Sequence, residues 1–130
     1  MKALFVIGGL CLATALAFGQ RDTCDTFDDC KKALEANPKS SSAHYRIGDL
    51  YFQERNLQSA ANSFRAALNG DLQPKWTEVW SHVQLGKIFD ITKQRDRALN
   101  EYRHAQQTND NTRGALDEAA KYIEAPYDGK

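Results

Sequence analysis

A 38-residue repeat in the middle of the chain constrains the fold more than any other feature. Small residues of the first unit are matched by small residues 38 positions later, and bulky apolar residues are matched by bulky apolar residues at the same offset. The two aligned sets are His44, Ile47, Gly48, Tyr51, Ala60, Phe64 and Ala67, then His82, Leu85, Gly86, Phe89, Ala98, Tyr102 and Ala105. So many matched pairs exceed what chance produces, so the chain contains repeated units that stack on one another.

Each unit contains two apolar patterns with the period of a helix. Apolar and small residues recur at i, i+3, i+4 and i+7 from residue 44, and a similar pattern follows from residue 60, after a polar break at Glu54-Arg55-Asn56. The second unit repeats the arrangement, with its break at Lys93-Gln94-Arg95. The spacing predicts helices over 41–54, 57–69, 75–92 and 95–107, paired as two antiparallel hairpins. The predicted fold class is all-α.

Glycine and alanine at the repeated positions predict close contact between the two helices of each hairpin. Gly48 and Gly86 lie where a side chain would hold the backbones apart, and glycine inside a helix costs roughly 1 kcal/mol against alanine. Ala60 and Ala98 are expected to serve the same contact from the second helix. The aromatic residues at the repeated positions then fill the core, so this set is expected to be structural.

Further helices are predicted on both sides of the two full units. Residues 26–38 form half a unit that ends at Pro38, and Ala33 stands 34 residues before Ala67. Residues 112–124 form one more amphipathic helix, closed by Pro126. The last repeat has an apolar face that no further repeat covers, so a single closing helix is expected to cover it.

These features resemble the tetratricopeptide repeat family, whose 34-residue unit has glycine, alanine, aromatic residues and proline at fixed places. The segment Ala33-Leu34-Glu35-Ala36-Asn37-Pro38 is similar to the usual end of such a repeat. The resemblance implies a short tetratricopeptide-like solenoid of antiparallel helical hairpins over residues 20–130. It divides into a half repeat at 26–38, repeats at about 41–74 and 79–112, and a C-terminal capping helix at 112–124.

The second interval departs from the family pattern. It is 38 residues long and not 34, which places about four inserted residues around Asn69 to Lys75. The insertion can lengthen the helix that begins near Trp76 by one turn, or it can widen the connecting loop. His44 and His82 also stand where the family favours Trp or Leu.

The first 19 residues have the pattern of a secretory signal peptide. Lys2 is followed by an apolar run from Ala3 to Phe18, and Ala17-Phe18-Gly19 supplies small residues for cleavage before Gln20. The run is short for a permanent span, which needs about 20 apolar residues. We therefore expect an exported protein, periplasmic or secreted, with no membrane span after cleavage; an uncleaved N-terminal anchor is the alternative.

The charge balance argues against nucleic acid as a partner. The full chain has 17 basic and 17 acidic residues, and Lys2 is the only charged residue within positions 1–19. Binding to nucleic acid or to an anionic membrane needs clustered Lys and Arg, and no such excess exists here.

Cys24 and Cys30 remain after cleavage, in a compartment that is expected to be oxidising. An intramolecular disulfide is the leading interpretation, with an intermolecular bridge or two free thiols as alternatives. The bond requires Cys24 to precede the helix, because residues six apart on one helix point to different faces. Thr26, with Asp29 three residues later, resembles a capping box that would start the helix near Phe27.

No motif in the sequence predicts catalysis, a cofactor or a metal. His44 and His82 are followed four residues later by Gly48 and Gly86, so neither has a second ligand on its own helix. A zinc site needs convergent ligands, and no suitable spacing occurs. We expect both to be partly buried packing residues. Serines 40–42 are expected to cap the following helix. The prediction is a protein that is not an enzyme.

The family resemblance implies a partner-binding groove lined by the first helix of each hairpin. The predicted groove residues are Tyr45, Arg46, Asp49, Phe52, Trp80, Gln84 and Lys87, with Gln53, Val83 and Ile91 beside them. Of Trp76 and Trp80, one is expected in the core and the other, Trp80 by preference, at a partner. The Lys, Asn and Arg clamp that some members use for acidic tails is not reproduced.

The predicted function is therefore a non-enzymatic protein–protein interaction module. It would act as an adaptor or assembly factor that binds a peptide or helix of another exported protein through its concave face. The alternative is a structural solenoid that self-associates, and a metal-binding protein or enzyme ranks below both. The oligomeric state does not follow from the sequence.

Overall fold

The computed structural model describes residues 24–130, so the predicted signal peptide at 1–19 lies outside the described residues. The elements, in chain order, are α1 (Phe27–Ala36), α2 (Ser41–Gln53), α3 (Leu57–Leu68), α4 (Trp76–Ile91), α5 (Arg95–Gln107), the 3₁₀ helix η1 (Thr112–Gly114) and α6 (Ala115–Glu124). The described part of the chain contains no strand, which confirms the predicted all-α class. None of its helices is long and apolar enough to cross a bilayer.

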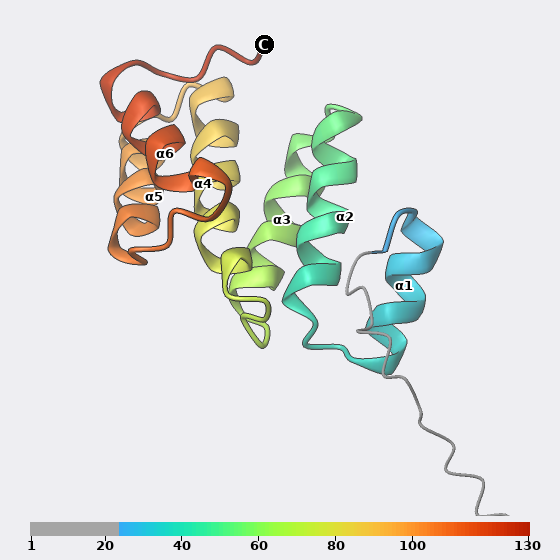
Figure 1. Ribbon diagram of the computed structural model, residues 1–130. Helices are drawn as coiled ribbons and strands as arrows, with labels where there is room; N and C mark the ends of the chain where they lie inside the picture. Colours follow the sequence, from blue (N-terminus) through green and yellow to red (C-terminus); the bar gives the residue numbers. More distant parts are fainter. Residues whose placement is uncertain (1–23) are drawn as a thin grey trace, which may run out of the picture.

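The helices form two central hairpins with one helix on either side. Helices α2 and α3 make the first hairpin and α4 and α5 the second, while α1 precedes them and α6 packs against α4 and α5 (Figure 1). The four predicted central helices agree with the structure to within one residue at each end. This is the short solenoid of antiparallel hairpins, with a capping helix, that the repeat predicts.

The repeated glycines lie at the tightest contacts inside the hairpins. A Cβ placed on Gly48 would lie 2.8 Å from Phe64 Cε1, and one on Gly86 would lie 2.3 Å from Tyr102 Cε1. Both ring-bearing residues, and Ala60 on α3, are fully buried. The predicted reason for the glycines is therefore confirmed: each allows an aromatic ring of the second helix to lie against the backbone of the first.

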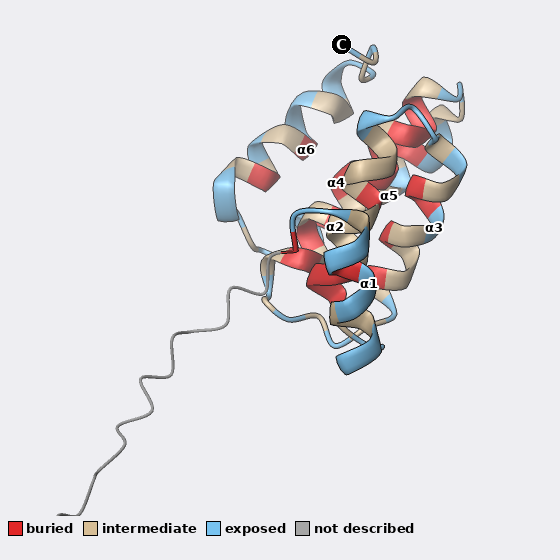
Figure 2. Ribbon diagram, turned by 90° about the vertical axis from the view of Figure 1, so that its right-hand side faces the viewer, coloured by how far each residue is buried: buried red, intermediate tan, exposed pale blue. Residues whose placement is uncertain are grey.

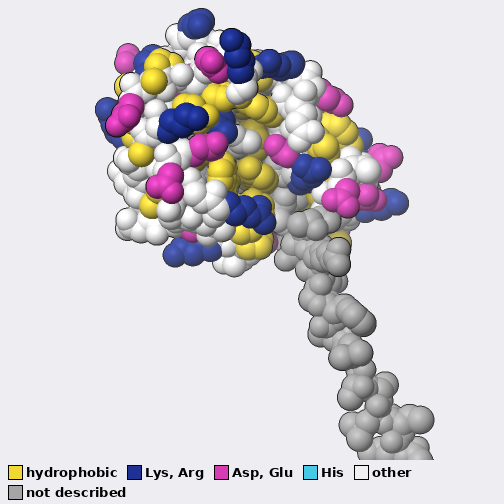
Figure 3. Space-filling model, turned by 45° about the horizontal axis from the view of Figure 1, so that its top comes forward, with side chains coloured by type: hydrophobic (Ala, Val, Ile, Leu, Met, Phe, Trp, Pro, Cys, Tyr) yellow, Lys and Arg dark blue, Asp and Glu magenta, His cyan; other side chains and the backbone are white. Residues whose placement is uncertain are grey.

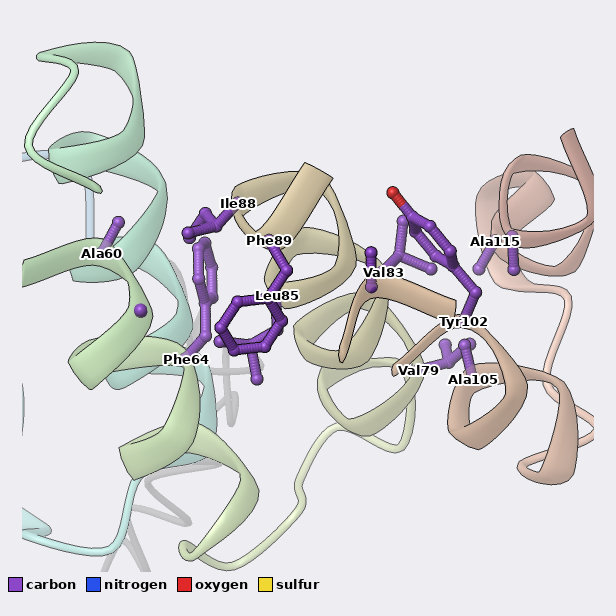
Figure 4. Packing of buried hydrophobic residues seen from close by; sticks show 13 residues of the cluster. Ala60, Phe64, Val79, Val83, Leu85, Ile88, Phe89, Tyr102, Ala105 and Ala115 are labelled. Atoms are coloured by element: carbon purple, nitrogen blue, oxygen red, sulfur yellow. The ribbon is translucent and has the colours of Figure 1, made fainter. Parts of the chain in front are cut away.

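Helix α4 is the centre of the hydrophobic core. Its residues Leu85, Ile88 and Phe89 lie on the side of α3, while Val79 and Val83 lie on the side of α5 and α6 (Figure 4). A helix that contacts neighbours on several sides needs apolar residues around most of its circumference. Buried residues accordingly line much of α4, whereas α5 and α6 bury one stripe each (Figure 2).

The inserted residues lengthen α4. Ser41 begins α2, and its counterpart 38 residues later is Val79, yet α4 begins at Trp76. The extra turn is Trp76 to Glu78, so the helix is lengthened as the first of the two alternatives predicts. The loop before it, residues 69–75, is also longer than the loop at 37–40 between α1 and α2. This turn places Trp76 beside α2.

The loop at 69–75 is held against the start of α2 by polar contacts, of which the bond from Ser41 Oγ to Ala67 O is buried. Ser41 Oγ donates to Ala67 O (2.6 Å) and accepts from Leu72 N (2.9 Å). The Asp71 carboxylate accepts from Ser41 N (3.1 Å) and from Asn37 Nδ2 (3.2 Å). A Cβ on Gly70 would lie 2.4 Å from Ser41 Oγ, so only glycine fits there. These contacts fix the loop to the first hairpin.

A disulfide fixes the beginning of the described chain. Cys24 Sγ and Cys30 Sγ are bonded, with their Cα atoms 4.9 Å apart. Thr26 caps α1 by accepting from Asp29 N at 3.1 Å, so α1 begins at Phe27 as the capping pattern predicts. Closing so small a loop stabilises the fold by about 2 kcal/mol on the chain-entropy model.

Buried Asp90 holds the C-terminal tail on the second hairpin. Its carboxylate accepts from Tyr102 OH (2.8 Å) and from Tyr127 N (2.9 Å), and it pairs with Arg95 (3.0 Å). Burial and the hydrogen bond to Asp90 raise the pKa of Tyr102. Arg95 also donates to Ile123 O at 2.8 Å. One carboxylate thus joins α4, α5 and the segment that follows α6.

Candidate binding groove

A hollow of about 330 Å³ lies on the inner side of the solenoid, between α2, the start of α4 and η1. Hydrophobic side chains gather along the middle of this face, with charged side chains beside them (Figure 3). The residues that line the hollow are Asp25, Ser42, Tyr45, Arg46, Asp49, Trp76 and Arg113. A concave site with an aromatic wall and a few polar groups is what ligand sites usually offer.

Aromatic rings form one wall of this hollow. Tyr45 lies between Phe64 (ring centroids 5.3 Å apart) and Trp76 (5.1 Å, edge to face). Arg113 of η1 lies over the Trp76 ring, with its Cζ 5.1 Å from the centroid. Trp76 is thus held from two sides, by a ring from α2 and by a cation from the segment before α6.

Charged groups of both signs lie beside the aromatic wall, on the same helix α2 as Tyr45. Arg46 pairs with Asp49 at 2.6 Å, and Gln53 donates to the same carboxylate at 3.1 Å. Burial, with the negative charge of Asp49 nearby, raises the pKa of Tyr45, so its hydroxyl stays protonated and can donate a hydrogen bond. The hollow therefore offers aromatic surface and a hydroxyl donor beside an ion pair.

The chain's own C-terminal part covers the rest of the inner face. Trp80 Nε1 donates to Thr112 O at 2.9 Å. Lys87 pairs with Glu118 of α6 at 3.1 Å, and its Nζ lies within 6.0 Å of the ring centroids of Trp80, Tyr122 and Tyr127. The side chain of Lys87 is only 12% exposed, so α6 and the tail already occupy this part of the face.

The structure brings together only part of the predicted groove set. Tyr45, Arg46 and Asp49 line the hollow, whereas Trp80 and Lys87 contact the C-terminal part of the chain. Gln84 and Val83 are buried and so have little surface for a partner, Ile91 is half-buried at the end of α4, and Gln53 is exposed. Phe52 lies near Tyr127, with ring centroids 6.5 Å apart. The role of the exposed members remains a prediction.

The predicted groove set omits two residues that line the hollow, Arg113 and Trp76, of which Trp76 is considered only as the alternative to Trp80. The prediction favours Trp80 over Trp76 for partner contact, but neither is fully buried and it is Trp76 that lines the hollow. The sequence contains part of the information that points to Trp76, because this residue stands in the inserted turn and four residues before Trp80. The position of Arg113 depends on its backbone, which has φ of 56°, and no sequence pattern predicts it.

The histidines contact neighbouring groups of the protein. His44 Nε2 lies 3.0 Å from Pro38 O, and His82 Nδ1 lies 2.7 Å from Glu101 Oε2. His82 also stacks on exposed His104, with ring centroids 5.2 Å apart. Across residues 24–130 there is no group of three or more His, Cys, Asp or Glu placed to hold a metal ion.

Comparison with known proteins agrees with the repeat and the helical architecture. A family model for the tetratricopeptide repeat matches residues 20–108, which is more than half of the chain. The chain belongs to the tetratricopeptide repeat family. A search of curated proteins and a search of solved structures found no match. Tetratricopeptide repeats generally mediate protein–protein interaction, so an interaction module is the function class that the family supports.

Proposed function

We propose that this tetratricopeptide repeat protein is a non-enzymatic adaptor or assembly factor that binds a peptide or helix end of another exported protein. The observation that carries the proposal is the inner hollow with Tyr45 and Trp76 on its wall. Aromatic residues and arginine dominate binding energy at protein interfaces, and both types line this hollow. The disulfide Cys24–Cys30 supports an oxidising, exported location.

The size of the hollow limits the length of the bound segment. About 330 Å³ accommodates a few side chains and not an extended peptide along the whole inner face. Because α6 and the tail cover the part around Lys87, the partner enters at the end marked by Trp76 and Arg113. The ion pair Arg46–Asp49 at the rim favours a partner segment that is polar beside its apolar anchor.

The alternative, a self-associating solenoid, draws no support from the cysteines. Cys24 and Cys30 are bonded to each other, so in this structure neither bridges two subunits. Sedimentation velocity across a range of concentrations separates the two: the adaptor is expected to remain a monomer without its partner, and a concentration-dependent dimer would favour the alternative.

The test uses both tryptophans of the chain as reporters, since Trp76 and Trp80 both lie on the inner face. Peptides selected from a random display library against residues 20–130 are titrated while tryptophan fluorescence and calorimetric heats are recorded. Trp76→Ala is expected to weaken binding at least tenfold, which is about 1.4 kcal/mol. Arg46→Gln is expected to weaken it less.

Exposed Arg103 on α5 gives the matched control, because it lies outside the hollow. Arg103→Gln is expected to bind the selected peptides as the wild type does. Equal affinities for Trp76→Ala, Arg46→Gln and Arg103→Gln, in variants whose circular dichroism melts match the wild type, would show that the hollow is not the binding site.

A further inference from the structure

A second hollow, of about 200 Å³, lies between α3 and α5 on the outer side of the solenoid. Figure 2 places α3 and α6 on opposite sides of the molecule, with α2 and α4 between them, so this site is separate from the inner groove. Its lining residues come from three helices and one turn: Leu57, Gln58, Ala61, Arg65, Ile88, Phe89, Thr92, Gln94 and Arg97. No residue is shared with the inner hollow.

Two arginines converge on one buried ring in this outer hollow. Phe89 is 5% exposed, and the Cζ atoms of Arg97 and Arg65 lie 4.1 and 5.8 Å from its ring centroid. Cation–π contact with a fixed ring holds a guanidinium in place and leaves the N–H groups at its edge available for a ligand. The Phe89 ring thus positions Arg65 of α3 and Arg97 of α5 over the same part of the hollow.

Neither arginine has an acidic partner among residues 24–130. Arg97 donates to Gln94 Oε1 (2.6 Å) and Arg65 to Asn62 Oδ1 (3.3 Å), and both acceptors are neutral amides. By contrast, Arg46, Lys87 and Arg95 each form an ion pair with an aspartate or glutamate of the chain. Each guanidinium has five N–H donors, so most donors of Arg65 and Arg97 remain free.

The surroundings select the kind of anion. The floor of the hollow is formed by the buried apolar residues Ala61, Ile88 and Phe89. The amide of Gln58 stands beside this floor, whereas the amide of Gln94 is already bonded to Arg97 and to Thr92 Oγ1. A guanidinium matches a carboxylate with two parallel hydrogen bonds, while the amide of Gln58 can pair with a peptide backbone. The full chain has no net charge, so it has no general attraction for a polyanion such as nucleic acid or an anionic membrane.

We propose that this outer hollow, formed by Arg65, Arg97 and Phe89, binds the carboxylate of an acidic residue in a peptide segment of a partner protein. The apolar floor accepts the carbon atoms of that residue or of its neighbour, and the two guanidinium groups neutralise its charge. This site is additional to the inner groove and does not depend on it, since the two share no residues.

The test compares two tripeptides, acetyl-Leu-Glu-Leu-amide and the same peptide with glutamine in place of glutamate. Each is titrated into residues 20–130, the chain expected after signal cleavage, and binding is measured from amide chemical shifts in NMR spectra. The glutamate peptide is expected to shift signals of Gln94 and Arg97 and to bind at least tenfold more tightly than the glutamine peptide. The double variant Arg65→Gln/Arg97→Gln is expected to lose this preference, whereas Arg103→Gln, at an exposed position of α5, is expected to keep it. Raised salt should weaken binding of the glutamate peptide only.

Two further arms distinguish the outer hollow from the inner one, and a carboxylate from a phosphate. Trp76→Ala, in the inner hollow, is expected to bind the glutamate peptide as the wild type does; a loss there would place the peptide in the inner groove and overturn the proposal. Inorganic phosphate is expected to bind more weakly than the peptide, and tighter phosphate binding would overturn the assignment to a carboxylate. Equal binding of both peptides, or an unchanged preference in the double variant with a wild-type melt, would also overturn it.

Discussion

The two repeated glycines occupy equivalent positions, but their surroundings differ in how far a neighbour can move. The Phe64 ring beside Gly48 has no polar group that fixes it. The Tyr102 ring beside Gly86 is fully buried and its hydroxyl donates to buried Asp90, which also holds Arg95 and Tyr127 N. A shift of Tyr102 therefore disturbs a hydrogen-bond network and not packing alone.

Gly86→Ala is expected to destabilise the protein more than Gly48→Ala. The new Cβ would lie 2.3 Å from the Tyr102 ring in one case and 2.8 Å from the Phe64 ring in the other. Overpacking costs typically about 1–3 kcal/mol, against a gain of roughly 1 kcal/mol in helix propensity, so a net loss is expected for Gly86→Ala. Urea unfolding measures both, with Asn100→Ala on the exposed face of α5 as the control. A larger loss for Gly48→Ala would contradict the role given to the Asp90 network.

At the scale of the elements, the loop at 69–75 that connects the two hairpins is anchored to the start of α2 by Asp71. Partial burial disfavours the charged carboxyl, but hydrogen bonds from Gln73 N, Ser41 N and Asn37 Nδ2 outweigh it, and the pKa of Asp71 is lowered from 3.8. A lowered pKa in the folded state means that the carboxylate form stabilises the fold. This contribution is fully present above the unfolded pKa and is lost as pH falls through the lower, folded value.

Asp71→Asn is expected to lower stability at neutral pH by about 1 kcal/mol, because charge-assisted hydrogen bonds are replaced by neutral ones and the site is solvent-exposed. The difference in unfolding free energy between wild type and variant should become smaller as the pH falls from about 5 to about 2, because the wild-type carboxyl becomes protonated. Chemical unfolding at a series of pH values measures this difference. Glu35→Gln, at an exposed position of α1, should give no such convergence; a constant difference for Asp71→Asn would refute the assignment.

The repeat pattern predicted those elements that depend on contacts local to one hairpin. Helix ends, the glycine–aromatic contacts and the Thr26 cap follow from spacings within about 20 residues, which a single sequence displays. The lengthened α4 was one of two alternatives, because inserted residues can enter either a helix or a loop. Trp76 joins the site only through Tyr45 of the other hairpin and Arg113 of η1, and such distant pairings leave no periodic signal.

For the whole molecule, the decisive feature is that the chain covers part of its own inner face. The tail after α6 crosses the ends of α4 and α2: Tyr127 N donates to Asp90, and Arg55 Nη2 donates to Gly129 O at 3.1 Å. In Figure 1 the C-terminus accordingly lies over the end of the molecule where these helices finish. The tail and α6 therefore cover the inner face around Lys87, whereas the hollow beside Trp76 is lined by neither.

Removal of residues 126–130 is expected to uncover part of the inner face around Lys87. Lys87 would lose Tyr127 from its surroundings, and Phe52 would lose its aromatic neighbour, so both become more exposed. Loss of one hydrogen bond to a buried carboxylate and of the Tyr127 contact should lower stability by about 1–3 kcal/mol. Acylation of Lys87, followed by mass spectrometry with exposed Lys32 as the internal reference, should become faster relative to the full chain.

The same truncation distinguishes a short partner segment from a longer one. If the tail limits the groove, peptides extended beyond the inner hollow should bind the truncated chain more tightly than the full chain, while short peptides bind both alike. Tyr127→Ala, which keeps the tail backbone and its bond to Asp90, should give an intermediate gain, because only the ring over Lys87 is removed. Unchanged Lys87 reactivity in the truncated chain would mean that α6 alone covers this part of the face, through Glu118 and Tyr122.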